Sequence, residues 1–226
     1  MNYIQTPKSL LSWSGGKDSS LSYHALRESK DLETVGLLTT VTSDYQRISM
    51  HGVRRELLHR QARVLGLPLY EVAIPKNATN EIYEDNMTRK ILELKERKGV
   101  SQLVFGDLFL RDIRSYRERF LAELGLDCNF PIWGRNTSQL AQSFLRDGFR
   151  AKVCCVDPKK IGSEFCGRDY DLDFLLDLPK DADPCGENGE FHTFVYAGPI
   201  FRKSIDVKVG EVVERDGFYF ADILPA

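Results

Sequence analysis

The stretch Ser12-Trp13-Ser14-Gly15-Gly16-Lys17-Asp18-Ser19 decides the interpretation of this chain. It stands between an expected strand at residues 9–13 and an expected helix at residues 19–28. Its two glycines permit a tight turn and a close approach of the backbone to a ligand. The serines add hydroxyl donors, the lysine adds a positive charge, and the start of the helix turns free N–H groups toward the same point. Together these features predict a site for a phosphate or pyrophosphate group.

Two other glycine loops do not fit the stretch. A Walker A loop requires a glycine at position 11 and a hydroxyl after the lysine, but the chain has Leu11 and Asp18 there. The dinucleotide fingerprint G-x-G-x-x-G is also missing from the sequence. The alternative that involves no ligand is an ordinary glycine turn in which Asp18 caps the following helix.

Strand-like and helix-like segments alternate through the first ~150 residues, which is typical of parallel α/β folds. Glycines stand where several of the helices would end. The further expected strands are residues 34–41, 67–74 and 100–105, and the further expected helices are residues 53–65, 79–98, 113–124 and 140–145. We therefore predict a nucleotide-binding α/β domain over residues 1–135.

The pattern changes in the remaining segment, residues 136–226. A strand is expected at residues 151–156 and a short helix at residues 172–178, followed by a loop rich in Asp, Gly and Glu. Three more strands are expected at residues 192–196, 205–213 and 218–223, and the Asp216-Gly217 pair is a tight-turn signal between the last two. These patterns predict a smaller α+β segment, and they leave open whether its strands share the sheet of the first domain.

Composition limits the classes of function. The 226 residues include 31 Lys and Arg against 33 Asp and Glu, so the net charge of −2 argues against general nucleic-acid binding. No apolar run reaches the ~18 residues of a membrane span, and no signal peptide is recognisable, so we expect a cytoplasmic protein without a membrane partner. The five cysteines lack C-x-x-C spacing, which disfavours a zinc ribbon, a redox pair and a disulfide scaffold.

Ligands of open α/β sheets lie beyond the carboxyl ends of the strands. The candidates at such ends are Thr39, Thr40, Gly106, Asp107, Trp133 and Gly134. A further candidate, His51, lies at the start of the helix expected at residues 53–65. Thr39 and Thr40 either contact adenosine or are simply residues that favour a strand. Gly106 would let a nucleotide approach the backbone. The aspartate could accept from a hydroxyl, bind Mg²⁺ through water or cap a helix. The histidine could bind phosphate, cap a helix or pack.

Three arginines, Arg111, Arg114 and Arg117, recur at intervals of three and therefore share one side of the expected helix. They could clamp a phosphate or an anionic substrate. The alternative is a solvated face whose charges pair with neighbouring acidic residues. Tyr116 belongs to the apolar face of the same helix, and we include it among the candidate substrate-binding residues.

The late loop reads Asp183-Pro184-Cys185-Gly186-Glu187-Asn188-Gly189-Glu190-Phe191-His192-Thr193-Phe194. Its glycines make it tight, so the two glutamates and the histidine could crowd together as acid–base groups, or the glutamates could hold Mg²⁺. The alternative is a loop whose charges stay solvated. Cys185 is either a nucleophile or, as we favour, a structural thiol.

Residues 14–19 resemble the pyrophosphate loop of the N-type ATP pyrophosphatases, which use ATP to adenylate a carbonyl or carboxyl oxygen and release pyrophosphate. More segments narrow the resemblance: Met50-His51-Gly52-Val53-Arg54, Phe105-Gly106-Asp107 with residues 111–118, Phe130-Pro131-Ile132-Trp133-Gly134, and residues 183–194. Together they resemble the diphthine–ammonia ligase family, also called the diphthamide synthase family, in its short prokaryotic form. The likeness covers nearly the whole chain.

This resemblance implies a Rossmann-like fold of the adenine nucleotide alpha-hydrolase type, with ATP and Mg²⁺ as cofactors. ATP would contact Ser12, Ser14, Gly15, Gly16, Lys17, Asp18 and Ser19, besides the candidates at the strand ends. A substrate carboxylate would attack the α-phosphate, and ammonia derived from ammonium would displace AMP. The implied catalytic residues are Lys17, Asp18, Glu187, Glu190 and His192. The implied substrate-binding residues are Arg111, Arg114, Tyr116, Arg117, Trp133, Gly134, Cys185, Gly186, Asn188, Gly189 and Thr193.

The acceptor of this family is the carboxyl group of a modified histidine on a translation elongation factor, which would apply to an archaeal or eukaryotic source. A bacterial chain would amidate a different small-molecule carboxylate. One alternative function is that of a tRNA-modifying enzyme that transfers sulfur. Such an enzyme would require catalytic cysteines and a basic surface. A second rival is a nucleotide-binding regulatory module, which loss of Lys17 or of the loop serines would have favoured. A homodimer remains an open alternative.

Overall fold

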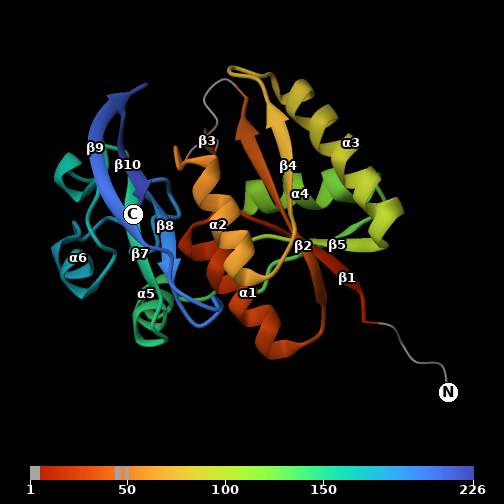
Figure 1. The fold of residues 1–226 in the computed structure, drawn as a ribbon, viewed down its shortest axis with the longest axis horizontal. Coiled ribbons are helices and arrows are strands. Elements are labelled where there is room, and N and C mark those ends of the chain that lie inside the picture. Colours follow the sequence, from red (N-terminus) through yellow and green to blue (C-terminus); the bar gives the residue numbers. More distant parts are fainter. Residues whose placement is uncertain (1–5, 44–46, 49–50) are drawn as a thin grey trace.

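The computed structural model describes residues 6–43, 47–48 and 51–226, so Met50 of the Met50-His51-Gly52-Val53-Arg54 segment lies outside it. The chain forms two β-sheets, which lie on either side of helices α1 and α2 (Figure 1). The elements of the first part are β1 (Lys8–Ser12), α1 (Lys17–Ser29), β2 (Glu33–Thr42), β3 (Arg47–Ile48), α2 (Arg55–Leu65), β4 (Leu69–Ile74), α3 (Asn80–Lys98), β5 (Val100–Val104), α4 (Arg111–Glu123) and β6 (Asp127–Asn129).

The first sheet is mostly parallel and has the order β3-β2-β1-β5-β6, with β4 also paired to β2. Only the short β3 runs antiparallel to its neighbour. Successive side chains of a strand face opposite sides, so Leu11 joins the core beneath α1 and α2 whereas Leu10 joins the core beneath α3 and α4. The predicted parallel, Rossmann-like α/β fold is confirmed.

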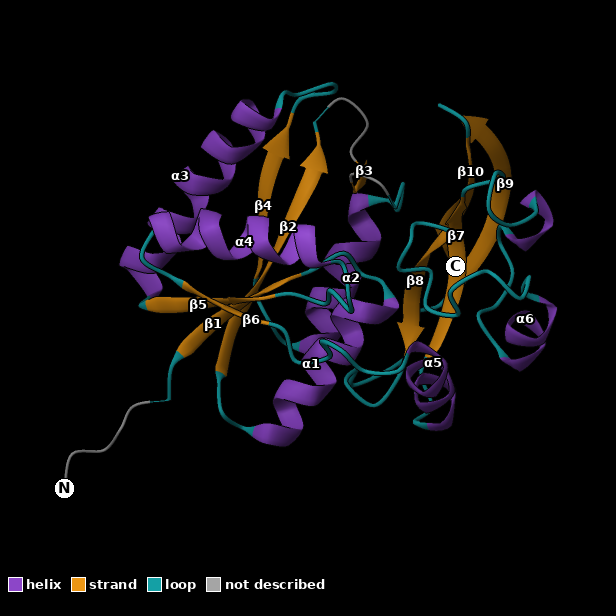
Figure 2. Cartoon of the chain, turned by 180° about the vertical axis from the view of Figure 1, so that it is seen from behind, coloured by secondary structure: helices purple, strands orange, loops and turns teal. Residues whose placement is uncertain are grey.

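The second sheet is antiparallel throughout, with the order β8-β7-β10-β9, and it shares no strand with the first (Figure 2). The expected β9–β10 hairpin turns at Asp216 and Gly217, which both have positive φ, as a tight two-residue turn requires. The elements of this part are α5 (Thr137–Arg146), β7 (Arg150–Val156), η1 (Ser163–Phe165), α6 (Leu172–Asp177), β8 (Phe191–Ala197), β9 (Val207–Arg215) and β10 (Phe218–Pro225).

Helices α1 and α2 join the two sheets through one continuous apolar core. Leu57 and Leu58 of α2 are fully buried in the same cluster as Phe194 and Val195 of β8. The backbone N–H of Arg202 also donates to the carbonyl of Val64 at the end of α2 (3.1 Å). The glycine loop follows the carboxyl end of β1, and this end of the first sheet therefore faces the second sheet.

The helix ends follow the predicted signals. Thr79 caps α3 by accepting from the N–H of Ile82, and the left-handed Gly66 and Gly99 close α2 and α3. Helix α1 begins at Lys17, two residues before the expected start. Within the described ranges, no helix has both the length and the apolar character needed to cross a membrane.

Candidate nucleotide-binding site

The glycine loop connects β1, which ends at Ser12, to α1, which begins at Lys17. Gly15 has a φ of +79°, a conformation that favours glycine. Gly16 is the N-cap of α1, and no side chain caps the helix there. The alternative in which Asp18 caps α1 therefore does not hold, and the positive end of the helix faces the loop.

The loop hydroxyls form a small network around the turn. Ser14 Oγ accepts from the N–H of Gly16 (3.2 Å) and lies 3.3 Å from Ser19 Oγ. Ser19 Oγ in turn donates to the carbonyl of Gly16 (3.0 Å). Thr193 of β8 accepts from the N–H of Lys17 (3.1 Å). These hydrogen bonds hold the loop in place, and both serines line the cavity described below.

Gln61 of α2 holds the loop from behind, although it belongs to none of the predicted motifs. This fully buried side chain donates to the carbonyls of Gly15 (2.9 Å) and Val195 (2.7 Å) and accepts from Trp13 Nε1 (2.8 Å). The N–H of Val195 also donates to the Gly15 carbonyl (2.9 Å). The available signal was its spacing, since a polar residue four places after Leu57 interrupts the apolar stripe of α2.

A cavity of about 490 Å³ opens in front of the loop. It brings together the loop, the end of β5, the start of α4 and the late loop before β8. The predicted site residues that line it are Ser12, Ser14, Lys17, Asp18, Ser19, His51, Gly106, Asp107, Arg117, Gly186, Glu187, Gly189, His192 and Thr193. Apolar residues that were not predicted also line it: Phe105, Leu110, Ile113 and Phe191. Their side chains give the cavity an apolar wall that suits an adenine ring.

Lys17 and Asp18 form a close ion pair on the cavity wall, with Nζ 2.9 Å from Oδ2. Burial alone would lower the pKa of Lys17, but Asp18 and the other acidic groups nearby outweigh burial and raise it. Burial raises the pKa of Asp18, against the opposing charge of Lys17. The second carboxylate oxygen, Oδ1, is buried without a hydrogen-bond partner among the described residues. It is the oxygen available to a ligand.

Glu187 is the late-loop carboxylate that reaches the cavity. Its Oε1 accepts from the N–H of Leu108 (2.7 Å). Burial raises the pKa of the Glu187 carboxyl to about 7, with a further contribution from the negative charge of Asp18. A carboxyl with this pKa exchanges its proton near neutral pH, which suits a general base.

Glu190 occupies a different place, because it is buried and does not line the cavity. Its Oε1 accepts from the N–H of Asp183 (3.0 Å) and from Asn188 Nδ2 (3.1 Å). Asp183 closes the same loop by accepting from the N–H of Glu187 (2.9 Å). Glu190 and Asp183 thus hold the turn that presents Glu187.

His192 and His51 lie together at the cavity, with ring centroids 4.4 Å apart. Burial lowers the pKa of His192 well below its usual value, and the nearby His51 and Lys17 lower it further. His192 is therefore neutral at physiological pH. It can accept a hydrogen bond or a proton but does not add positive charge.

Of the three arginines, Arg117 alone lines the cavity. It pairs with Asp107 (Nε to Oδ2, 2.8 Å) and lies over the ring of Phe105. Arg114 instead pairs with Glu118 and lies over two aromatic rings, and Arg111 is exposed at the start of α4.

The other predicted residues lie around the cavity rather than on its surface. Tyr116 donates to Glu84 (2.8 Å), and the N–H of Gly134 donates to the Leu108 carbonyl (2.8 Å). Cys185 is buried, and burial raises its pKa to about 12, which favours the structural thiol. The remaining predicted residues outside the lining are Gly15, Gly16, Thr39, Thr40, Trp133 and Asn188.

Gly106 is required by a close approach of two chain segments. A Cβ at this position would lie 2.8 Å from the backbone carbon of Asp18. Only glycine allows the end of β5 to meet the start of α1 at this distance. The motif that includes Gly106 therefore shapes the floor of the cavity.

Two family models match the chain. The one described as Diphthamide synthase N-terminal domain covers residues 7–128, and the one described as Diphthamide synthase C-terminal domain covers residues 136–223. The first match contains the glycine loop and the second contains the late loop, so both walls of the cavity lie within matched segments.

Several proteins named diphthine–ammonia ligase are similar to the chain. The Bos taurus protein is 29% identical over 198 residues, which cover 79% of this chain and 70% of the relative. The Mus musculus protein is 26% identical over 238 residues, covering 93% and 86% of the two chains. The Schizosaccharomyces pombe protein is 26% identical over 224 residues, covering 89% of this chain and 36% of a longer relative.

Proposed function

The chain belongs to the diphthamide synthase family, and from this premise we propose that it is an ATP-dependent ligase that adenylates a carboxylate and transfers ammonia to it. One observation carries the proposal. A single cavity joins a glycine loop at the N-terminus of α1 to a carboxyl with a pKa of about 7. The first group suits a triphosphate, and the second suits proton removal from an incoming ammonium ion.

ATP would place its β- and γ-phosphates on the glycine loop, where backbone N–H groups and the hydroxyls of Ser14 and Ser19 converge. Its adenine would lie against the apolar wall near Phe105 and Ile113. A substrate carboxylate oxygen would then attack the α-phosphorus, and the bond to pyrophosphate would break. Lys17 would stabilise the charge that gathers on the departing pyrophosphate.

Magnesium fits the wall of the cavity because Asp18 Oδ1 is a buried carboxylate oxygen without a hydrogen-bond partner among the described residues. Proteins commonly hold Mg²⁺ through one or two carboxylates, with phosphates and water as the other ligands. When bound, the ion would neutralise phosphate charge. The part of the chain that the structure describes contains no cluster of three or more metal-ligating side chains.

Glu187 would take a proton from ammonium, and the neutral ammonia would attack the acyl carbon of the adenylate. The bond between this carbon and the AMP oxygen would break, and the nitrogen would lose a second proton to give the amide. His192, neutral and beside the same cavity, is the alternative base. Glu190 would support the step by holding the loop that carries Glu187.

The acceptor we propose is the carboxyl of a modified histidine on an elongation factor, as the resemblance to the diphthine–ammonia ligases implies. For a bacterial source we propose another carboxylate instead. The sulfur-transfer alternative gains no support from the cysteines. Burial raises the pKa of all five thiols, so none is a ready thiolate at neutral pH.

A product assay with labelled ATP, ammonium and a panel of carboxylates tests the proposal. We expect AMP and pyrophosphate as products, formed only with an accepted carboxylate. Lys17→Ala should abolish this turnover while the fold persists. Glu187→Gln should keep carboxylate-dependent pyrophosphate exchange but slow amide formation by ~10²-fold or more, the usual contribution of a general base. Release of ADP and phosphate, or full activity of Lys17→Ala, would refute the mechanism.

A further inference from the structure

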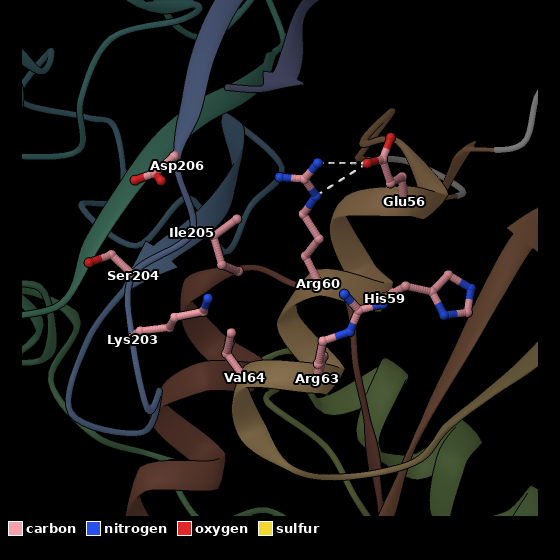
Figure 3. A pocket seen from close by; sticks show the side chains of 9 residues that line it. All are labelled: Glu56, His59, Arg60, Arg63, Val64, Lys203, Ser204, Ile205 and Asp206. Atoms are coloured by element: carbon pink, nitrogen blue, oxygen red, sulfur yellow. Dashed lines mark hydrogen bonds and ion pairs between the residues drawn. The ribbon is translucent and has the colours of Figure 1, made fainter.

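A second cavity, of about 300 Å³, lies between α2 and residues 203–206 (Figure 3). Its charged lining residues carry both signs, since Glu56 pairs with Arg60 (2.8 Å) and Asp206 lines the cavity together with Lys203. Among the described residues, none lines both this cavity and the nucleotide cavity. A surface of mixed charge singles out no ligand, whereas the packing behind the late loop bears directly on the nucleotide cavity.

The late loop turns sharply at residues 183–186. The N–H of Gly186 donates to the Asp183 carbonyl (2.8 Å), which closes a four-residue turn with Pro184 and Cys185 at its centre. The Pro184 carbonyl belongs to the central peptide of this turn, which takes no part in the closing hydrogen bond, so its partner must come from outside the turn. Glu187 follows directly, and the orientation of the turn therefore determines where the Glu187 carboxyl lies.

Tyr170, which stands between β7 and α6, supplies this partner. Its hydroxyl donates to the Pro184 carbonyl (2.7 Å). The N–H of Tyr170 donates to the Ala151 carbonyl of β7 (2.9 Å), and only 1% of the residue is exposed. Burial raises the pKa of the Tyr170 hydroxyl well above its usual value, so the hydroxyl remains a hydrogen-bond donor at physiological pH.

Aromatic packing holds Tyr170 against the wall of the nucleotide cavity. Its ring centroid lies 5.3–5.9 Å from those of Phe144, Phe174 and Phe191. Phe191 itself lines the nucleotide cavity, and Lys17 Nζ lies 5.6 Å from its ring centroid. Close packing of this kind leaves a side chain little freedom to move. Tyr170 is thus a fixed point from which a hydrogen bond reaches the late loop.

We infer that Tyr170 is a positioning residue for the reaction proposed above, because its hydroxyl fixes the turn at residues 183–186 and thereby holds the Glu187 carboxyl at the nucleotide cavity. The consequence for catalysis rests on the proposed function, in which Glu187 takes a proton from ammonium. Tyr170 does not line the cavity and acts only through the turn. A general base must stay within hydrogen-bond reach of its proton, so a small displacement of Glu187 slows the step.

Tyr170→Phe tests the inference, because it removes one oxygen atom and keeps the buried ring. We expect carboxylate-dependent pyrophosphate exchange and the KM for ATP to change by less than about twofold, while amide formation in a single turnover slows about tenfold, as the loss of one hydrogen bond allows. Tyr196→Phe is the matched control, because its hydroxyl also donates to an oxygen (Asp169, 3.1 Å) but ties β8 to the segment before α6 instead of to the late loop.

Hydrogen exchange of the Leu108 amide, followed by NMR, measures the placement of Glu187 without any turnover. This N–H donates to Glu187 Oε1 (2.7 Å), so its protection from exchange reports that contact. We expect about tenfold faster exchange in Tyr170→Phe and no change in Tyr196→Phe. Glu187→Ala gives the exchange rate of the Leu108 amide when the contact is absent.

Faster exchange at Leu108 together with slower amide formation and intact pyrophosphate exchange would support the inference. Unchanged exchange at Leu108 would overturn it, and so would equal effects in Tyr196→Phe. A parallel loss of pyrophosphate exchange and amide formation would also overturn it, because the hydroxyl would then support the whole site. If the natural chain forms no amide from any carboxylate, the proposed function fails, and exchange at Leu108 alone decides whether Tyr170 places Glu187.

Discussion

Glu187 holds a proton in the folded protein at pH values where the unfolded chain has lost it. Burial raises its pKa from the ordinary 4.5 to about 7, and the nearby Asp18 adds to the effect. Between these two values the folded state binds more protons than the unfolded state, so the free energy of unfolding falls as pH rises. The group that suits proton transfer thus costs stability at neutral pH.

We therefore expect Glu187→Gln to reduce the fall in melting temperature of the ligand-free protein between pH 4.5 and about 7. The variant should melt a few degrees above the natural chain at pH 8, since the amide stays neutral when buried. Thermal unfolding across a pH series measures both effects.

Glu71→Gln provides the control, because the pKa of Glu71 is lowered whereas that of Glu187 is raised. Despite burial, hydrogen bonds and charge from Arg55 lower the pKa of Glu71, so its stabilising contribution is present above the ordinary 4.5 and is lost only as pH falls below it. This variant should melt lower at all pH values above 4.5, without a changed slope up to pH 7. An unchanged slope in Glu187→Gln would contradict the raised pKa.

Most residues of the cavity wall are recognisable from the sequence, but Gln61, which supports the glycine loop from behind, is not. Ser14, Lys17 and Glu187 stand in motifs whose chemistry is legible from residue type and spacing. Gln61 is not in such a motif, because its role depends on carbonyl groups of Gly15 and Val195, which are distant in the sequence. Only the folded chain brings these groups together.

At the scale of elements, β10 fixes the turn that carries His51. Arg47 and Arg54 both donate to the Asp222 carboxylate of β10, at 2.6–3.0 Å. Arg47 also donates to the Gly52 carbonyl (2.7 Å), and Gly52 lies so close to Phe220 that a Cβ would approach the ring to 2.7 Å. The C-terminal hairpin therefore sets the position of one wall of the nucleotide cavity.

Asp222→Ala should release this turn and raise the KM for ATP by about tenfold, which corresponds to ~1.4 kcal/mol of binding free energy. The effect on kcat should be smaller, because the glycine loop and Glu187 keep their own supports. Steady-state kinetics measure the split. Asp169→Ala is the matched control, since Asp169 also accepts from a cation (Lys152, 2.7 Å) but lies away from the cavity. Equal changes in both variants would assign Asp222 to general stability.

The longer elements were predictable and the shortest were not. The amphipathic α2 and the capped α3 follow patterns of ten or more residues, which local propensity and burial both support. Strands β3 and β6 have two and three residues, too few to display an alternation of side chains. Their pairing is set by neighbouring strands rather than by their own sequence.

Considering the chain in full, the two sheets share one apolar core. Their shared core includes residues of β1, α1 and α2 together with β7, β8 and β10. The sequence indicated two parts but left their connection open, since contacts such as Gly15 to Val195 have no local signature. The glycine loop thus rests against the second sheet, and its geometry depends on both parts being folded.

Gln61→Leu tests this dependence. Leucine has a similar size but leaves Trp13 Nε1 without an acceptor and removes donors from two buried carbonyls, so we expect a loss of about 2–4 kcal/mol in the free energy of unfolding. The melting temperature should fall by about 5–10 °C for a chain of this length.

Calorimetry should still show one transition for both sheets, and the added stability from saturating ATP should shrink because the loop loses its support. Gln142→Leu, at an exposed position of α5, should leave all three quantities unchanged. Two separate transitions in the natural chain would show that the shared core does not couple the sheets, and the loop would then owe its shape to the first sheet alone.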